Sequence, residues 1–202
     1  MKNAAIEPLK ESLINSLIES FALHWPLTPD AISALEERAL ISTFKKRAII
    51  LTPGTVCRHL NFVVSGCTRM FITDGKGKQH NLQFAVENQW ISDHGSFYAY
   101  EQSQLSIEAL EPVTLIQIER DDLFFFYGHS PLFDRNFRII AENAFIDQQK
   151  RILQNISATA EERYLYFLGR YPELVNRISN VQIASFLGIT PEFLSMIKKK
   201  IS

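Results

Sequence analysis

Hydrophobic positions along the chain change their period twice. They recur every three to four residues over 5–45, as in amphipathic helices, with a restart at the capping residue Thr28. From about 47 to 118 they form short apolar runs separated by turn signals, of which Asp-Gly-Lys-Gly at 74–77 is the strongest. From residue 121 the pattern is helical again. Many short strands between helices predict an α+β fold built on a β-barrel or jelly roll.

The sequence next predicts one long helix from Pro131, with Ser130 as its cap. One stripe of residues recurs every three or four positions, close to a coiled-coil seam over about three heptads, at Phe137, Ala141, Phe145, Gln148, Ile152 and Ile156. We therefore expect a homodimer that pairs through residues 133–156. Packing within one subunit is the alternative, because amphipathic helices usually face their own core. Gln148 is polar on the seam, so it either sets the register or touches a polar ligand.

The C-terminal end of the sequence predicts two short helices joined by a tight turn. Ser179 suits the N-cap of the first helix, and Gln182 completes a capping-box pattern. Gly188 stands where a sharp turn needs a positive φ. Thr190 and Pro191 then suit the cap and the first residue of the second helix. This pattern is typical of a helix-turn-helix that reads the DNA major groove, and an ordinary helical hairpin is the alternative.

The second of these helices has two different faces. Leu194, Ile197 and Ile201 share one side and are expected to face inward. The residues expected to meet DNA are Thr190, Pro191, Glu192, Ser195, Met196, Lys198 and Lys199. Glu192 can accept a hydrogen bond from cytosine, whereas the lysines suit phosphates, which position a protein without reading sequence. The sequence stops with this helix, so no β-wing is expected after it.

Composition places the chain among ordinary globular proteins. It has 202 residues, of which 46% are hydrophobic and 21% charged. No apolar run reaches the length of a membrane span, and the N-terminus has no apolar signal core, so no membrane contact and a cytoplasmic location are expected. Cys57 and Cys67 are too few for a disulfide framework or a cysteine-bound metal cluster.

The net charge of −1 hides an asymmetry along the chain. Residues 131–202 carry ten Lys and Arg against seven Asp and Glu, whereas residues 1–130 carry eleven against fifteen. The sign is the one expected if the C-terminal part meets phosphate and the N-terminal part does not.

The order of these parts resembles the family of the cyclic-AMP receptor protein and FNR, bacterial transcription regulators. LTPGTV and FVVSGCTRMFITDGKGK are similar to the opening strands of the family's sensor domain, and EERYLYFL and QIASFLGITPEFLS to its DNA-binding helices. A WISD…SF segment and the shortened C-terminus resemble one subgroup. The resemblance implies a cyclic-nucleotide-binding-like β-roll over 1–130, a dimerisation helix over 131–157 and a helix-turn-helix domain over 158–202. It also implies double-stranded DNA and RNA polymerase as partners.

The sensor departs from family members that bind cyclic AMP. Their phosphate-binding cassette has a Gly-Glu pair and, about ten residues later, an Arg-Ser pair. Aligning the strands puts Ser92 and Asp93 at the first pair and Ser103 and Gln104 at the second. Asp93 still suits a ribose hydroxyl, but no arginine stands between residues 70 and 119 to pair with the phosphate. We therefore expect cyclic AMP to bind weakly or not at all.

A different small-molecule effector remains open. The residues expected to line its pocket are Ser92, Asp93, His94, Ser96, Ser103, Gln104 and Gln148. No cofactor or metal is expected, because an iron–sulfur centre needs about four cysteines. Nothing in the spacing of His59, His80 and His94 singles out a haem ligand.

The DNA-reading helix departs from the family as well. Members that read G·C pairs place one arginine near the start of the helix and another about a turn later, where this chain has Pro191 and Met196. Each such contact contributes about 1–3 kcal/mol of discrimination, so we expect a different operator or weak binding.

Two other classes of function compete with a transcription regulator. A ligand-sensing or protein-interaction module that has lost specific DNA binding would explain the missing arginines. An enzyme on a cupin-like jelly roll would need clustered histidines and carboxylates on its strands. The histidines of this chain are not spaced in that way, so no enzymatic activity is expected.

Overall fold

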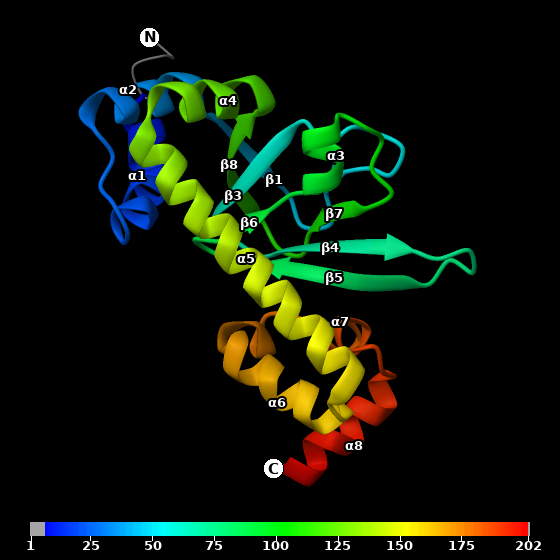
Figure 1. Cartoon of the computed structure of the whole chain (residues 1–202). Coiled ribbons are helices and arrows are strands. Elements are labelled where there is room, and N and C mark those ends of the chain that lie inside the picture. Colours follow the sequence, from blue (N-terminus) through cyan, green and yellow to red (C-terminus); the bar gives the residue numbers. More distant parts are fainter. Residues whose placement is uncertain (1–6, 202) are drawn as a thin grey trace. The chain divides into compact units, whose positions relative to one another are not determined.

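The described part of the chain contains eight strands, which form two sheets of interleaved order (Figure 1). The computed structural model describes residues 7–201. One sheet has the order β1-β8-β3-β6 and the other β2-β7-β4-β5. The strands are β1 (Leu40–Phe44), β2 (Ile49–Leu51), β3 (His59–Ser65), β4 (Thr68–Thr73), β5 (Gln79–Ala85), β6 (Trp90–Ile91), β7 (Ser106–Ala109) and β8 (Val113–Glu119). Strands that alternate between the sheets in this way make a jelly-roll β-sandwich.

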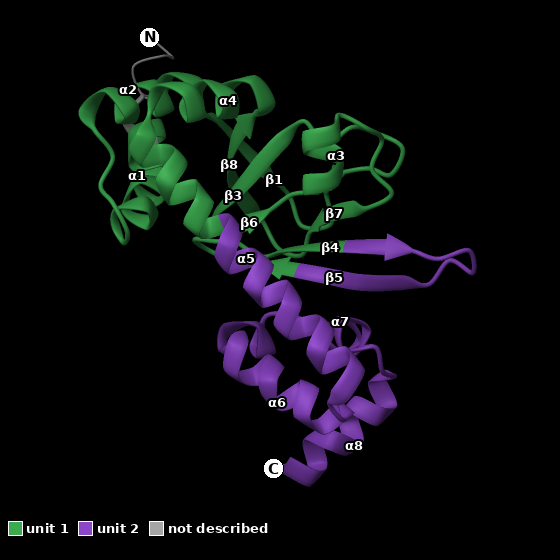
Figure 2. Ribbon diagram, viewed as in Figure 1, with its two compact units in different colours: residues 1–70, 84–140 green, residues 71–83, 141–202 purple. Residues whose placement is uncertain are grey.

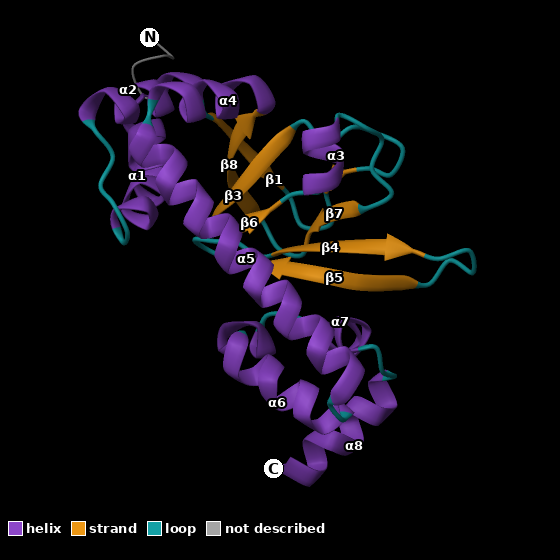
Figure 3. Ribbon diagram, in the orientation of Figure 1, coloured by secondary structure: helices purple, strands orange, loops and turns teal. Residues whose placement is uncertain are grey.

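Helices precede and follow the strands (Figure 3). They are α1 (Glu7–Ala22), α2 (Pro29–Arg38), α3 (His94–Ala99), α4 (Arg120–His129), α5 (Pro131–Ser157), α6 (Ala160–Arg170), the 3-10 helix η2 (Pro172–Asn176), α7 (Asn180–Leu187) and α8 (Pro191–Ile201). The predicted caps of α2 and α5 are confirmed: Thr28 accepts a hydrogen bond from the Ala31 amide, and Ser130 accepts one from the Phe133 amide. Among the described helices, none is long and apolar enough to cross a membrane.

The chain divides into two compact units (Figure 2). The first comprises residues 1–70 and 84–140, and the second comprises 71–83 and 141–202. Strands β4 and β5 and helix α5 each contribute residues to both units.

An aromatic cluster forms much of the core of the first unit. Phe133 stacks on Phe126 with ring centroids 4.5 Å apart and meets Phe21 edge-on at 5.2 Å. Phe137 lies edge-on to Trp90 at 5.4 Å. These rings join α1, α4, β6 and the first turns of α5, so the start of the long helix belongs to the core of its own subunit.

Two local expectations in this unit are wrong. Leu40 and Ile41 do not continue the helical pattern but pair with Gln117 and Ile116 in the ladder between β1 and β8. The helix ends at Arg38, after which the backbone is extended, and the ladder with β8 outweighs the local helical spacing. Helix α3 was not expected, because six residues do not show a full apolar period.

The second unit is mainly helical. Its core is formed by Tyr164 and Phe167 of α6, Leu174 of η2, and apolar side chains of α7 and α8. A capping box begins α6: Thr159 accepts a hydrogen bond from the Glu162 amide, and the Glu162 carboxylate accepts one from the Thr159 amide.

Candidate nucleic-acid interface and effector site

Helices α7 and α8 pack against each other across a glycine turn. Ile183, Ala184 and Leu187 are buried on α7, and Leu194 and Ile197 are buried on α8. Equivalent spacing of apolar residues on both helices gives each one inner and one outer face.

The turn between the two helices requires its glycine. Gly188 has a φ of +68°, a conformation that side chains with a Cβ rarely adopt. A Cβ built there meets nothing within 4 Å, so backbone conformation rather than space explains the residue. Thr190 then caps α8, as predicted, by accepting a hydrogen bond from the Phe193 amide at 3.2 Å.

The outer face of α8 is exposed at Glu192, Ser195, Met196 and Lys199. The Ser195 hydroxyl donates to the Pro191 carbonyl within the helix, at 2.9 Å. Glu192, Met196 and Lys199, which are predicted to meet DNA, therefore have exposed side chains that a partner could contact. The Ser195 hydroxyl is exposed as well, but it is already hydrogen-bonded to the backbone of its own helix.

The basic end of α8 is partly engaged within the chain. Lys198 donates to the Asn180 side chain at 2.6 Å, and Lys200 pairs with Glu161 at 2.5 Å. Lys199 is exposed beside them. Ile201, which was expected to face inward, remains 37% exposed at the end of the helix.

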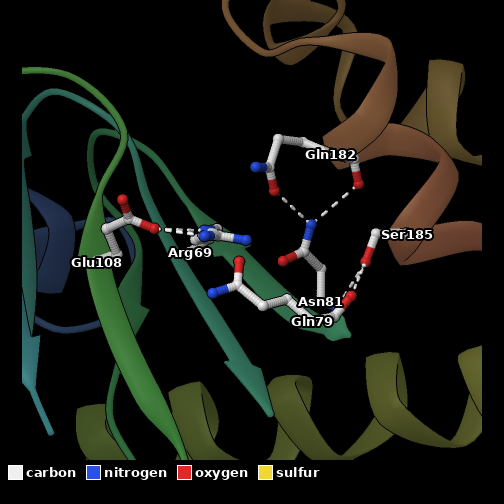
Figure 4. A network of polar contacts seen from close by, with 6 residues as sticks. All are labelled: Arg69, Gln79, Asn81, Glu108, Gln182 and Ser185. Carbon is white, nitrogen blue, oxygen red and sulfur yellow. Dashed lines mark hydrogen bonds and ion pairs between the residues drawn. The ribbon is translucent and has the colours of Figure 1, made fainter. Parts of the chain in front are cut away.

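The predicted capping box at the start of α7 is wrong. Ser179 makes no side-chain cap hydrogen bond, and the Gln182 side chain binds Asn81 instead (Figure 4). The Asn81 side-chain amide donates to the Gln182 side-chain oxygen at 2.7 Å and to its carbonyl at 3.0 Å. The Asn81 backbone amide donates to the Ser185 hydroxyl at 3.1 Å, and that hydroxyl donates to the Gln79 carbonyl at 2.9 Å.

These bonds satisfy an exposed sheet edge. Strand β5 stands at the end of its sheet, so its outward backbone groups have no neighbouring strand. Arg151 of α5 donates to the carbonyls of Leu82, Asn81 and Phe186, and its guanidinium lies 4.0 Å from the centre of the Phe186 ring. Helix α7 is thereby held against strand β5 by hydrogen bonds from Asn81, Gln182 and Ser185, together with Arg151 of α5.

The candidate effector residues in the first unit form a polar cluster around α3. The Asp93 carboxylate caps α3 by accepting from the Ser96 amide at 3.2 Å. It also accepts from the Ser103 hydroxyl at 2.6 Å, and this hydroxyl in turn accepts from the Leu105 amide at 2.9 Å. Each oxygen of this carboxylate therefore accepts one hydrogen bond from its own loop.

The other two serines of the cluster have similar partners. The Ser92 hydroxyl accepts from the Asn61 amide at 3.0 Å. The Ser96 hydroxyl accepts from the Cys57 amide at 2.8 Å and donates to the Glu101 carbonyl at 2.5 Å. Both serines are buried, so they join separate backbone segments.

The remaining candidates are not among the hydrogen-bonded residues described above. His94 is exposed and stacks on Tyr98, with ring centroids 6.2 Å apart, and Gln104 is also exposed. Gln148 belongs to the second unit, where it lines a different cavity. Hydrogen bonds therefore join Asp93 directly to Ser96 and Ser103, whereas Ser92 binds Asn61 on the neighbouring strand β3.

Arg69, the last arginine before residues 70–119, forms an ion pair with Glu108. Arg69 of β4 donates through Nε at 2.7 Å and lies 2.5 Å through Nη2 from the same oxygen of Glu108 on β7 (Figure 4). Both side chains are largely buried, at 7% and 14% exposure. This guanidinium is therefore neutralised by a carboxylate of its own sheet.

The predicted seam of α5 divides into two parts. Phe137 is buried in the core of the first unit, whereas Phe145, Ile152 and Ile156 are 63%, 57% and 79% exposed. Leu153 beside them is 63% exposed. Exposed apolar clusters of this kind are unusual on monomers, which makes this part of α5 a candidate contact surface.

Comparison with known proteins supports the fold described above. Residues 41–129 match the family model of the cyclic nucleotide-binding domain. No curated protein sequence matches the chain.

Solved structures match over most of the chain at low identity. FixK2 from Bradyrhizobium japonicum is 18% identical, with 81% of this chain and 84% of that chain covered and a TM-score of 0.71. The c-di-GMP responsive global regulator CLP of Xanthomonas campestris is 15% identical, with 86% and 91% covered and a TM-score of 0.68. A transcriptional regulator of the crp/fnr family from Eubacterium rectale is 19% identical, with 86% and 83% covered and a TM-score of 0.66. The chain thus has the fold of Crp/Fnr-type regulators, with a cyclic nucleotide-binding domain in its first part.

Proposed function

We propose that this chain is a homodimeric, DNA-binding transcription regulator in which α7 and α8 act as a helix-turn-helix. The observation that carries the proposal is the packed α7–Gly188–α8 pair with an exposed outer face on α8. The fold shared with transcription regulators supports it. The recognition helix of such a pair lies in the major groove, with its first residues at the base edges.

The exposed side chains suggest how the contact would be divided. Glu192 stands in the first turn of α8, where a carboxylate can accept a hydrogen bond from cytosine. Lys199 is the exposed lysine best suited to a phosphate, because Lys198 and Lys200 are engaged by Asn180 and Glu161. Met196, 59% exposed, offers apolar contact to a thymine methyl.

Dimerisation would use the exposed part of α5. Phe145, Ile152 and Ile156 lie on the predicted seam and are open in the single chain. A twofold pair of reading helices contacts half-sites about 34–36 Å apart along the duplex.

The sensor domain would respond to something other than tightly bound cyclic AMP. The cluster of Ser92, Asp93, Ser96 and Ser103 is hydrogen-bonded to its own loops, and Arg69 is paired with Glu108. A cyclic phosphate would have to displace these contacts and find another cation.

Selection of duplexes from a random library, followed by mobility shifts over about 50–200 mM salt, tests DNA binding. We expect a preferred sequence of twofold symmetry. Lys199→Gln should weaken binding to all duplexes and lower the salt slope by about one, whereas Glu192→Gln should change the preferred base. Lys46→Gln, an exposed lysine of the first unit, serves as the matched control and should change neither.

The second candidate is a ligand-sensing or protein-interaction module without specific DNA binding. The observation that favours it is the engagement of Lys198 and Lys200 within the chain, together with the absence of arginine from α8. If no sequence is selected and Lys199→Gln leaves the salt slope unchanged, the regulator proposal is refuted and this candidate replaces it.

A further inference from the structure

A cavity rich in arginine lies within the second unit. It has a volume of about 50 Å³ and is lined by residues of β5, α5, α6 and α7 and by Tyr171, which stands between α6 and η2. Its polar lining includes Gln148, Arg151, Arg163, Tyr166, Arg170 and Tyr171. One water needs roughly 10–15 Å³ on this measure, so the cavity has room for a group of a few heavy atoms.

The charge of the lining is unbalanced. Three arginines line the cavity, and Asp147 is the single carboxylate among the lining residues. Asp147 pairs with Arg170 at 2.6 Å, which leaves two guanidiniums without a carboxylate in the lining. An anion of one or two negative charges would complete the balance.

Arg163 is the lining arginine with a buried donor that has no acceptor among the described residues. Its Nη1 donates to the Ala158 carbonyl at 2.9 Å, but its Nε is buried without a hydrogen-bond partner among the described residues. A buried charged donor that lacks an acceptor is destabilising, and the acceptor that suits a guanidinium best is a carboxylate or phosphate oxygen.

The other lining groups are held in place around the cavity. Arg151 is fixed by backbone carbonyls and by the Phe186 ring, and the Arg170 guanidinium lies 5.2 Å from the centre of the Tyr171 ring. Burial raises the pKa of the Tyr171 phenol, so its hydroxyl stays a neutral donor. Asp147, Tyr166 and Arg170 also line a wider neighbouring groove, which provides access.

We propose that this cavity binds a phosphate-class oxyanion, either free phosphate or the phosphate group of a small phosphomonoester. The ligand would accept hydrogen bonds from Arg163 Nε and from the unused donors of Arg151 and Arg170. Because α7 and β5 both form walls of the cavity, the anion would strengthen the docking of α7 on β5. A regulatory meaning of that effect rests on the proposed function, whereas the binding itself does not.

Calorimetric titration of the full chain with inorganic phosphate, at ionic strength held constant with chloride, tests the site. We expect saturable binding that Arg163→Gln weakens by tenfold or more. Arg58→Gln, an exposed arginine of the first unit, should bind like the natural chain. A phosphomonoester such as glycerol phosphate should compete with phosphate, and the tighter of the two identifies the free or the esterified anion as the ligand.

A second variant covers the case in which Arg163→Gln unfolds. Gln148 is exposed on α5, so Gln148→Glu should keep the fold while adding a repelling charge at the cavity, and phosphate affinity should fall by tenfold or more. The proposal is overturned if the natural chain shows no saturable binding, or if Gln148→Glu and a folded Arg163→Gln bind phosphate as tightly as the natural chain. These titrations contain no DNA, so their failure leaves the DNA-binding proposal standing, and the reverse also holds.

Discussion

Replacing Asn81 by alanine tests whether α7 is fastened to the edge of β5. The substitution removes two hydrogen bonds from the Asn81 side chain to Gln182, of 2.7 and 3.0 Å. Each contributes about 0.5–1.5 kcal/mol net, so the docking of α7 should weaken by about 1–3 kcal/mol. The backbone bond from residue 81 to Ser185 does not involve the side chain and should remain.

Hydrogen exchange of the α7 amides is the direct assay, because it measures the opening of one segment rather than global unfolding. At 1.4 kcal/mol per tenfold, exchange of these amides should accelerate roughly 5- to 150-fold in Asn81→Ala. Asn81→Asp should be at least as damaging, since it places a carboxylate opposite the two Gln182 oxygens. Asn143→Ala, at an exposed asparagine of α5, is the control and should leave α7 unchanged. Equal exchange rates in α7 for Asn81→Ala and the control would refute the reasoning.

Two further predictions concern the proposed dimer and the hairpin between β4 and β5. Ile152→Asp should shift the proposed dimer toward monomer in sedimentation experiments, because burying one isoleucine contributes about 1.5–3 kcal/mol. Leu23→Asp, at an exposed leucine of the first unit, is the control and should not change the oligomeric state. An unchanged dimer in Ile152→Asp would contradict this role for α5. The hydrogen bond from His80, followed by those from two backbone amides, lowers the pKa of Asp74 below its ordinary value of 3.8. The hairpin turn is therefore stabilised above about pH 4, and this stabilisation is lost as the pH falls through the lowered pKa; amide shifts of the turn should report it, and Asp74→Asn should abolish that titration.

Features set by neighbours in the sequence could be predicted. The caps at Thr28 and Thr190 each depend on an amide three residues later, and the structure confirms both. The positive φ of Gly188 is local in the same sense. Such features need no knowledge of what the segment packs against.

Features set by distant partners could not be predicted in this way. The local pattern predicts helix at Leu40 and Ile41, because the pairing of β1 with β8 leaves no signal in neighbouring residues. The seam of α5 keeps the same spacing along the helix, yet Phe137 is buried against Trp90 while Phe145 remains exposed. The spacing of apolar residues shows which side of a helix is apolar but not which partner covers each turn.

The case of Gln182 shows how a correct local pattern can serve another purpose. Ser179 and Gln182 have the spacing of a capping box, but the side chain of Gln182 binds Asn81, 101 residues earlier in the chain. Arg151 of α5 meets the same need, since its guanidinium donates to backbone carbonyls at the edge of β5. For Gln182, the need of the unpaired edge of β5 outweighs the local capping pattern, and this edge is where the consequences of α7 docking should first be sought.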